Sequence, residues 1–312
     1  MKAPISADAG YFYAAITLLI WSGFVVVSRI GSTGTLTPYD IAALRIGTSA
    51  LVLLPWWLPR LLQSGLRQLR WYQSLTLAVL VGITYPLVSY TGFQISPASH
   101  GAVLISGMLP FFTSIFAGFL LGERPNRVRV IGLALIVSGV MTLLFASIAT
   151  QPMGQSTLKG DLFLLTASCL WSLFTVLIKV WKVKAFDVTL GVSAVSALIY
   201  LPVFLLLLPS QLSTASWHEI ALQSFYQGFV MVCVAMWTYA KAVELLGSVK
   251  VVIMMSAVPV VGVLLAVPVL GETLTSGTAL GAAIVFLGAL IGAMARPATS
   301  ALPAAKTTVH RV

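Results

Sequence analysis

The stretch PFFTSIFAGFLLGE at residues 110–123 occurs a second time in altered form, as PVVGVLLAVPVLGE at residues 259–272. Both copies open on a proline, run through a helix length of apolar residues and end in Leu-Gly-Glu, 149 residues apart. The same register aligns Tyr90 with Tyr239, Ser99 with Ser248, Gly132 with Gly281 and Gly139 with Gly288, and with one residue more it aligns Trp21-Ser22 with Trp171-Ser172. The chain is therefore predicted to be a tandem duplication, which has to be recognised before any element is assigned.

The composition is that of a membrane protein. Hydrophobic residues make up 59% of the 312 residues and charged residues only 8%, against about 25% charged in ordinary soluble domains. Each half holds five nearly uncharged runs long enough to cross a hydrocarbon core of about 30 Å as helices. Backbone groups in lipid must be satisfied internally, and such continuous apolar runs exclude the alternation of a barrel. The prediction is an all-α integral membrane protein with ten transmembrane helices.

The predicted helices define two repeats and three connecting or terminal segments. The helices are predicted at residues 11–30, 39–59, 73–93, 99–121, 128–147, 160–180, 187–208, 220–244, 249–270 and 276–295. The predicted units are an N-terminal cytoplasmic segment at 1–10, a first five-helix repeat at 11–147, an external linker at 148–159, a second repeat at 160–295 and a disordered cytoplasmic tail at 296–312.

The distribution of Lys and Arg predicts the orientation. All but three of the 18 basic residues fall in segments on the side that holds both predicted termini; the exceptions are Arg29, Arg45 and Lys159. By the positive-inside rule, both termini are predicted to be cytoplasmic.

Five helices per half is an odd number, so the two repeats are predicted to be inverted relative to each other. The charges agree with this: the Arg-rich segment 60–70 aligns with 209–219, and GERPNRVR at 122–129 aligns with GETLTSGT at 271–278, both partners being free of Lys and Arg. Inverted repeats of this kind are typical of secondary transporters, whose substrate site lies near the midplane between the repeats.

Ten helices in two five-helix halves, the Trp-Ser pair in the first helix of each half and the Gly-Glu pair that ends the fourth resemble the EamA type of the drug/metabolite transporter superfamily. The resemblance covers roughly residues 11–295, and within the family it is greatest to the YddG-type amino-acid exporters of bacterial inner membranes. It implies a multi-pass inner-membrane protein.

Candidate substrate-binding residues are aromatic and hydroxyl side chains inside the apolar runs, supplemented by two ionisable ones. They are Trp21, Ser22, Tyr85, Ser89, Tyr90, Trp171, Ser172, Trp237 and Tyr239, with His100 and Lys241. A tryptophan inside a helix bundle is more often a packing residue, so each is weighed against that interpretation. Together they predict an uncharged, aromatic-walled cavity, which suits amphipathic or aromatic zwitterions better than sugar phosphates.

The remaining ionisable residues favour structural roles. Glu123 and Glu272 are predicted to act at helix ends, each near the N-terminus of the following helix, with Glu123 also able to pair with Arg124 or Arg127. A local pair with Asp40, or snorkelling, is the favoured interpretation for Arg45. Lys241 lies one turn before Glu244, a spacing that permits an ion pair.

Three prolines are candidate hinges. Pro110 and Pro259 lie about ten residues into the fourth helix of each half, and Pro86 interrupts the third helix of the first half. A proline inside a helix removes one backbone hydrogen bond and clashes with the preceding turn, which predicts a kink. Either the kinks are static, or the half-helices beyond them rock to open the cavity to one side at a time.

These observations predict a secondary transporter that exports amino acids, aromatic or otherwise amphipathic, by facilitated alternating access. Proton-coupled efflux of lipophilic cations or drugs is the alternative within transport, and a membrane-embedded lipid enzyme is the disfavoured alternative class. No phosphate-binding loop or hydrolase motif occurs, so neither catalytic residues nor an ATPase partner is expected. We also expect no cofactor, no metal and no nucleic-acid partner; the partners are the lipid bilayer and a small-molecule substrate, and the oligomeric state, monomer included, stays open.

Overall fold

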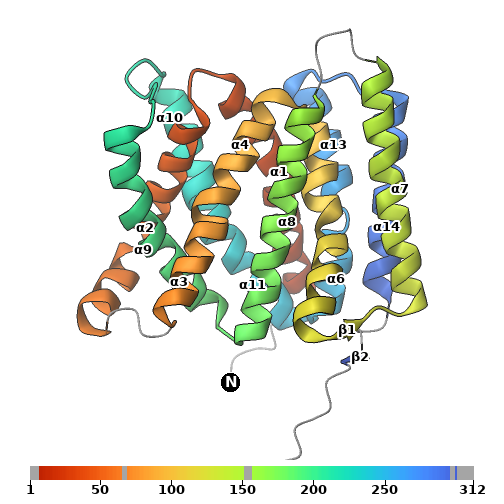
Figure 1. Cartoon of the computed structure of the whole chain (residues 1–312), viewed down its shortest axis with the longest axis horizontal. Helices are drawn as coiled ribbons and strands as arrows, with labels where there is room; N and C mark the ends of the chain where they lie inside the picture. The colour runs from red at the N-terminus through yellow and green to blue at the C-terminus, as the bar shows by residue number, and fades with distance from the viewer. Residues whose placement is uncertain (1–6, 65–68, 151–156, 296–298, 301–312) are drawn as a thin grey trace, which may run out of the picture.

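The computed structural model describes residues 7–64, 69–150, 157–295 and 299–300. These residues form a helical bundle (Figure 1) with ten helices long and apolar enough to cross a membrane, which confirms the predicted fold class. The elements are α1 (Ala7–Thr33), α2 (Pro38–Ser64), α3 (Trp71–Leu77), η1 (Ala78–Thr84), α4 (Tyr85–Ile95), α5 (Ala98–Gly101), η2 (Ala102–Gly107), α6 (Met108–Leu121), β1 (Glu123–Arg124), α7 (Arg127–Thr150), α8 (Leu158–Trp181), α9 (Ala185–Leu207), α10 (Trp217–Gln223), η3 (Ser224–Val234), α11 (Ala235–Leu246), α12 (Ser248–Met255), α13 (Val258–Leu270), α14 (Ser276–Met294) and β2 (Thr299–Ser300).

Several spans are built from more than one element. The third, fourth and eighth spans each contain a π-helical stretch, η1, η2 and η3 respectively, and the ninth is broken between α12 and α13. Shifted by the 149-residue offset, η1 falls inside η3, whereas η2 falls on α12 and the break that follows it.

The two repeats run in opposite directions through the bundle. In Figure 1, α1 begins and α14 ends at the lower surface, which we call the termini face, whereas α8 begins at the upper surface, the far face. The first helix of one repeat is therefore antiparallel to the first helix of the other, as the odd number of spans requires.

A glycine seam between α7 and α14 has the symmetry of an inverted pair. A Cβ added at Gly132 would come within 2.6 Å of the Gly288 carbonyl oxygen, and one at Gly139 within 2.7 Å of the Gly281 carbonyl oxygen. Gly132 is equivalent to Gly281 and Gly139 to Gly288, so exchanging equivalent residues converts the contact Gly132–Gly288 into the contact Gly281–Gly139, which is the pattern of a two-fold axis. Small residues here let the two backbones touch.

The Leu-Gly-Glu motif ends the fourth helix of each repeat in the same way. Gly122 and Gly271 both adopt φ +64°, the left-handed conformation that glycine adopts without strain at a helix C-terminus. The following helices carry their own caps: Asn126 Oδ1 accepts from the Arg129 amide at 2.9 Å, and the Thr275 hydroxyl oxygen accepts from the Thr278 amide at 3.1 Å.

Each candidate hinge proline coincides with a departure from regular α-helix. Pro86 follows η1, Pro110 follows η2 and Pro259 is the second residue of α13, just after the break. A proline cannot donate to the carbonyl four residues earlier, and a wide turn relieves the resulting clash.

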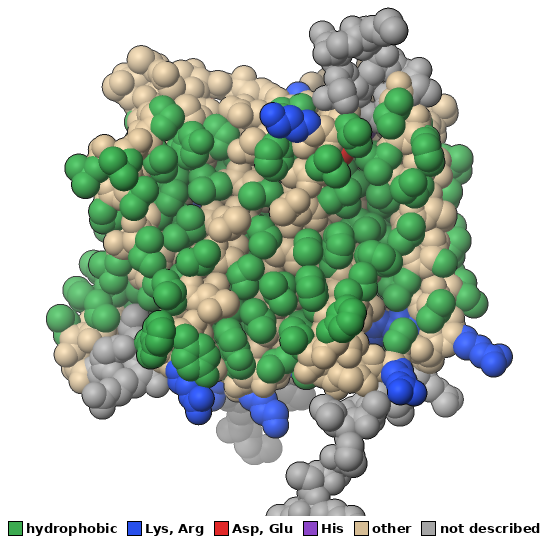
Figure 2. All heavy atoms as spheres, viewed as in Figure 1, with side chains coloured by type: hydrophobic (Ala, Val, Ile, Leu, Met, Phe, Trp, Pro, Cys, Tyr) green, Lys and Arg blue, Asp and Glu red, His purple; other side chains and the backbone are tan. Residues whose placement is uncertain are grey.

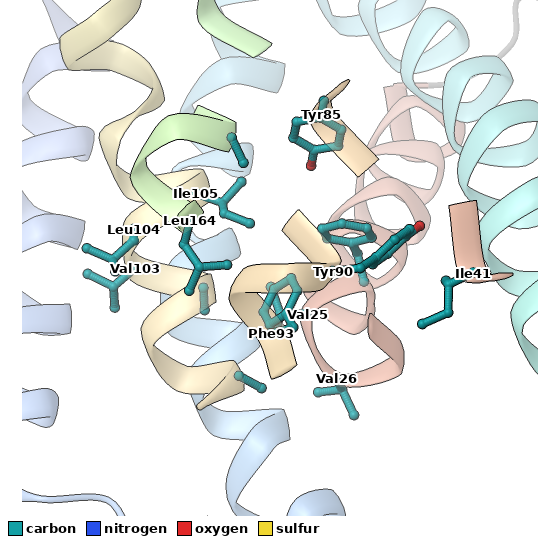
Figure 3. Packing of buried hydrophobic residues seen from close by; sticks show 14 of the residues in the cluster. Val25, Val26, Ile41, Tyr85, Tyr90, Phe93, Val103, Leu104, Ile105 and Leu164 are labelled. Atoms are coloured by element: carbon teal, nitrogen blue, oxygen red, sulfur yellow. The ribbon is translucent and has the colours of Figure 1, made fainter. Parts of the chain in front are cut away.

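The buried core is continuous only toward the far face. The main apolar cluster combines residues from the far-face halves of the spans, among them Val25, Tyr90, Phe93, Leu104 and Leu164 (Figure 3). Toward the termini face the buried residues divide into smaller clusters, one joining α1, α11 and α12 and another joining α3, α8 and α9. The bundle is thus closed on one face and divided on the other.

The tail differs in part from the predicted disorder. Thr299 and Ser300 form a short antiparallel pair with Arg124 and Glu123 of β1. The rest of the predicted tail beyond Ala295, residues 1–6 of the predicted N-terminal segment and residues 151–156 of the predicted linker lie outside the described residues.

Candidate functional site

A cavity of about 190 Å³ lies between the two repeats. It is lined by both halves of the chain and borders the middle of α1 and of α8, where Trp21 and Trp171 lie. Its lining residues are Trp21, Phe24, Arg45, Ile46, Ser49, Val81, Gly82, Tyr85, Ile105, Ser106, Leu109, Trp171, Phe174, Val188, Thr189, Val192, Ser193, Ser196, Met231, Val232, Met236, Met255 and Val258.

Aromatic rings from three spans form one wall of this cavity. The Trp171 ring lies 5.0 Å from the Tyr85 ring and 5.4 Å from the Phe174 ring, centroid to centroid. Phe24 stacks on the other side of Tyr85 at 6.4 Å. Such rings offer a broad apolar surface with limited rotamer freedom, which suits a flat apolar ligand.

The polar part of the wall is mostly hydroxyl. Ser49 donates to the Ile46 carbonyl at 3.0 Å and Ser196 to the Ala78 carbonyl at 3.4 Å. Ser106 and Ser193 add two further hydroxyls. Among the lining residues that the structure describes, Arg45 is the one charged side chain, and no described group of His, Cys, Asp and Glu is arranged to hold a metal.

The cavity extends toward the termini face and stops short of the far face. Val188 and Thr189 line it within about one turn of the start of α9 on the termini face. On the far side, Arg45 and Ile105 each lie seven residues from a helix end, or about 10 Å at 1.5 Å per residue. The main core cluster fills that remaining depth.

Glu272 stabilises the closed far face. Its two carboxylate oxygens accept from the first amides of the fourth span: Oε1 from Ala98 N at 2.6 Å and Oε2 from Ser99 N at 3.0 Å. Residues 98–101 are all buried, whereas their equivalents in the second repeat, residues 247–250, are all exposed. The contact that closes the far face therefore has no counterpart at the termini face.

This placement corrects the helix-end prediction for both glutamates. Glu272 caps the fourth span of the other repeat, and the helix that follows it is capped by Thr275. Glu123, its equivalent, forms an ion pair with Lys179 of α8 and not with Arg124 or Arg127. Sequence spacing favoured the nearest partners, and the tertiary fold supplies distant ones.

Three of the predicted binding residues, Trp21, Tyr85 and Trp171, line the cavity. The serines that follow the two tryptophans do not. Ser22 donates to the Val258 carbonyl at 3.4 Å and Ser172 to the Leu109 carbonyl at 3.2 Å. Val258 and Leu109 immediately precede the two equivalent hinge prolines. In each repeat, the Trp-Ser pair therefore places its tryptophan at the cavity, while its serine bonds to the residue that precedes the proline of the other repeat.

Other predicted residues lie above the cavity, in the closed region. Ser89 and Tyr90 are fully buried, and their hydroxyls have no hydrogen-bond partner among the described residues. Ser89 lies one turn beyond Tyr85 toward the far face, which removes it from the cavity wall. His100 is buried and its Nδ1 lies 3.0 Å from Oδ1 of Asp161, a partner that the sequence did not single out.

The last three predicted residues lie toward the surface of the bundle. Trp237 is 54% exposed and makes an edge contact with Tyr13 at 5.3 Å. Tyr239 is not a lining residue of the cavity, but its ring stacks on that of Trp21, with the centroids 5.2 Å apart. Lys241 pairs with Glu244 at 2.7 Å, as the spacing allowed.

Arg45 differs most from its prediction. Asp40 is not its partner: the Asp40 carboxylate accepts from the Thr37 amide at 2.8 Å, the Ser210 hydroxyl at 2.6 Å and the Gln211 amide at 3.0 Å. Arg45 lies instead at the cavity wall, one turn from Ser49 on the same helix face. The spacing of Arg45 and Ser49, which puts both on one helix face, could have indicated a polar cavity wall. The nearby Asp40 suggested a local ion pair instead.

Both the fold and the cavity are those of a membrane-spanning transporter with duplicated halves. The sequence matches the model of the EamA-like transporter family over residues 8–145 and 158–293, and the chain belongs to that family. The two matched segments are the two repeats, and the family consists of transporters, not enzymes.

Two individual proteins are similar to this chain. The uncharacterised transporter YyaM of Bacillus subtilis (strain 168) is 24% identical over 150 residues, which is 47% of this chain, so the chain matches about half the length of that relative (48%). A protein of known crystal structure has the same fold with a TM-score of 0.60 and 20% identity, over 92% of this chain and 96% of its own.

Proposed function

We propose that this transporter exports amphipathic amino acids, aromatic ones among them, and related small metabolites by alternating access. The observation that carries the proposal is the aromatic-walled cavity between the repeats, closed by packing toward one face alone. A site at the interface of inverted repeats is where secondary transporters bind their substrates. Its size and mixed aromatic and hydroxyl lining suit a single amino acid with an apolar side chain.

The orientation of the chain in the membrane follows from the charges on the two faces, and net export by a facilitator then follows the substrate gradient. Basic side chains gather along the lower edge of Figure 2, the termini face, beneath an apolar girdle. Arg70 precedes α3, Arg124 follows α6, Lys179 lies in the last turn of α8 and Lys184 precedes α9, and each of these helix ends lies at the termini face. The positive-inside rule makes that face cytoplasmic in the inner membrane of a bacterium, with both termini inside. The cavity extends toward this face, so the conformation described is the one that loads substrate from the cytoplasm.

Transport is facilitative. Among the described residues, no carboxylate lines the cavity, so nothing there couples a proton or a sodium ion to the substrate. The buried His100–Asp161 pair lies in the closed region outside the cavity wall.

Movement occurs about Pro110 and Pro259, assisted by Pro86. The half-helices beyond these prolines rock, and the hydrogen bonds from Ser172 and Ser22 hold the residues that precede Pro110 and Pro259. Pro110→Ala and Pro259→Ala should slow transport while leaving equilibrium substrate affinity within about threefold. Unchanged transport rates in both stable variants would reduce the prolines to static kinks.

The experiment that tests the function is uptake of labelled phenylalanine and tryptophan into proteoliposomes, with and without an imposed pH gradient. We expect saturable uptake and counterflow that do not depend on the gradient. Uptake that occurs only with a gradient would contradict facilitation. Absence of amino-acid uptake, together with proton-driven flux of a lipophilic cation such as tetraphenylphosphonium, would contradict the substrate assignment as well.

A further inference from the structure

Arg45 is a buried cation with no counter-ion in the part of the chain that the structure describes. Its side chain lines the cavity, the residue is only 8% exposed, and Nη1 is buried with no hydrogen-bond partner among the described residues. No described carboxylate lies within ion-pairing distance of it; the three ion pairs that the described residues form are elsewhere.

Such a charge is costly to keep. Removing a guanidinium from water without pairing it costs several kcal/mol, which is why charged residues inside membrane spans are rare and face partners or aqueous cavities. The Tyr85 ring compensates in part, with its centroid 6.0 Å from Arg45 Cζ. A ring face, however, offers no acceptor to Nη1, whose unpaired N–H groups match a carboxylate oxygen.

The rest of the wall distinguishes between the two ends of an amino acid. A carboxylate entering the cavity meets Arg45, with Ser49 one turn away on the same face. An ammonium group meets only hydroxyls, backbone carbonyls and rings, because the described lining residues include no Asp or Glu. The field of the cavity is therefore positive and favours anionic ligands.

We propose that Arg45 is the anion-recognising residue of this cavity and that its substrates are small amphipathic carboxylates. The carboxylate binds the guanidinium, and the apolar body lies against Tyr85, Trp171 and Phe174. Amino acids are bound as one kind of carboxylate, and their ammonium group is accommodated without being required. This inference rests on the proposed transport function and extends it by naming the chemical group that the site selects.

The test uses four ligands that share one phenylethyl body: phenylalanine, 3-phenylpropionate, phenylalanine amide and 2-phenylethylamine. Equilibrium binding is measured to the purified full chain in detergent. The two carboxylates should bind about 10- to 100-fold more tightly than the two ligands without one, the range given by a charged hydrogen bond of 1.5–3 kcal/mol.

Variants at Arg45 provide the second arm. Arg45→Gln should weaken binding of both carboxylates by about 10- to 100-fold and should not weaken binding of the other two ligands, which are cations. Arg45→Lys keeps the charge but loses the paired donors, so its effect should be intermediate. Arg60→Gln is the matched control: Arg60 is on the same helix, outside the cavity, with Nη1 donating to the Trp56 carbonyl at 2.8 Å, and binding should not change.

The outcomes separate this inference from the transport function. Equal affinity of the wild-type chain for all four ligands would overturn it, and so would an Arg45→Gln variant that keeps the preference for carboxylates. The wild-type ranking decides the question even if Arg45 variants do not fold. Phenylalanine flux without discrimination between the ligands would overturn the Arg45 assignment and leave transport standing. Selective binding of carboxylates without flux would support the site and count against transport.

Discussion

Glu272 provides a direct way to shift the transporter from one conformation to the other. Its carboxylate holds the Ala98 and Ser99 amides at 2.6 and 3.0 Å, at the start of a span whose first-turn amides have no helical partner. Both residues are buried, so Glu272→Ala leaves two amides without an acceptor and without water. The change therefore destabilises the far-face closure itself.

The size of the effect follows from these two bonds. A hydrogen bond to a charged group contributes about 1.5–3 kcal/mol, and neighbouring bonds are not fully additive. A combined loss of about 2–4 kcal/mol lowers the population of the conformer closed at the far face by roughly 30- to 700-fold relative to one open there. Glu272→Gln keeps an uncharged acceptor and should give a smaller shift.

The assay is labelling of a single cysteine at Ser106, which lines the cavity, in a chain whose two native cysteines have been replaced. A membrane-impermeant maleimide added from the far face should label the parent weakly and the Glu272→Ala variant strongly. Glu123→Ala is the matched control, because it removes the equivalent carboxylate and breaks only the pair with Lys179. It should not increase labelling from the far face.

One result would refute the reasoning. If Glu272→Ala lowers thermal stability but labelling from the far face does not rise, the carboxylate is a static cap present in every conformation. If the reasoning holds, the inverted symmetry predicts the opposite closure as well, in which Glu123 accepts from the amides of residues 247 and 248. A disulfide or crosslink between these segments should then trap the chain open to the far face.

Three further predictions concern the cavity, the seam and the topology. Trp171→Ala should lower phenylalanine flux tenfold or more with little loss of folded protein, because it removes a cavity wall; parallel loss of folding and flux on size-exclusion chromatography would make Trp171 a core residue. Gly139→Val should cost about 1–3 kcal/mol or more in thermal unfolding, because its Cβ would meet the α14 backbone at 2.7 Å, whereas Gly292→Ala, with open space, should be neutral. Cysteines at Asn126 and Ser276 should label from opposite sides of the membrane, and labelling of both from one side would contradict the inverted repeat.

Most of the fold could be predicted from the sequence because its determinants are either local runs of residues or repeats at a constant offset. A span is recognised from a run of apolar residues, and the repeat from the recurrence of Pro110 to Glu123 at a constant offset. The inversion follows because each half has an odd number of helices, five, and because the basic residues of segment 122–129 have no counterparts in segment 271–278. None of these inferences needs a contact between distant residues.

The candidate site could be predicted only in part. Trp21, Tyr85 and Trp171, which were chosen as aromatic residues deep in the apolar runs, line the cavity. Ser89, one turn from Tyr85, and Ser22, adjacent to Trp21, were equally good candidates by position, yet neither lines the cavity. Depth along the helix axis and rotation about it decide the difference, and both depend on how the spans pack against one another.

The sequence by itself determined the class, the spans, the duplication and its inversion, because hydropathy, charge and repetition are properties of the chain in order. Only the tertiary structure decided which charges are paired and which face is closed. Asp40 is occupied by Ser210 and Gln211 from a connection some 170 residues away, and that distant pairing leaves Arg45 to the cavity. Glu272 closes the far face by reaching the amides of the opposite repeat. A buried charge pairs with the groups that the tertiary fold places next to it, and these groups can be distant in the sequence.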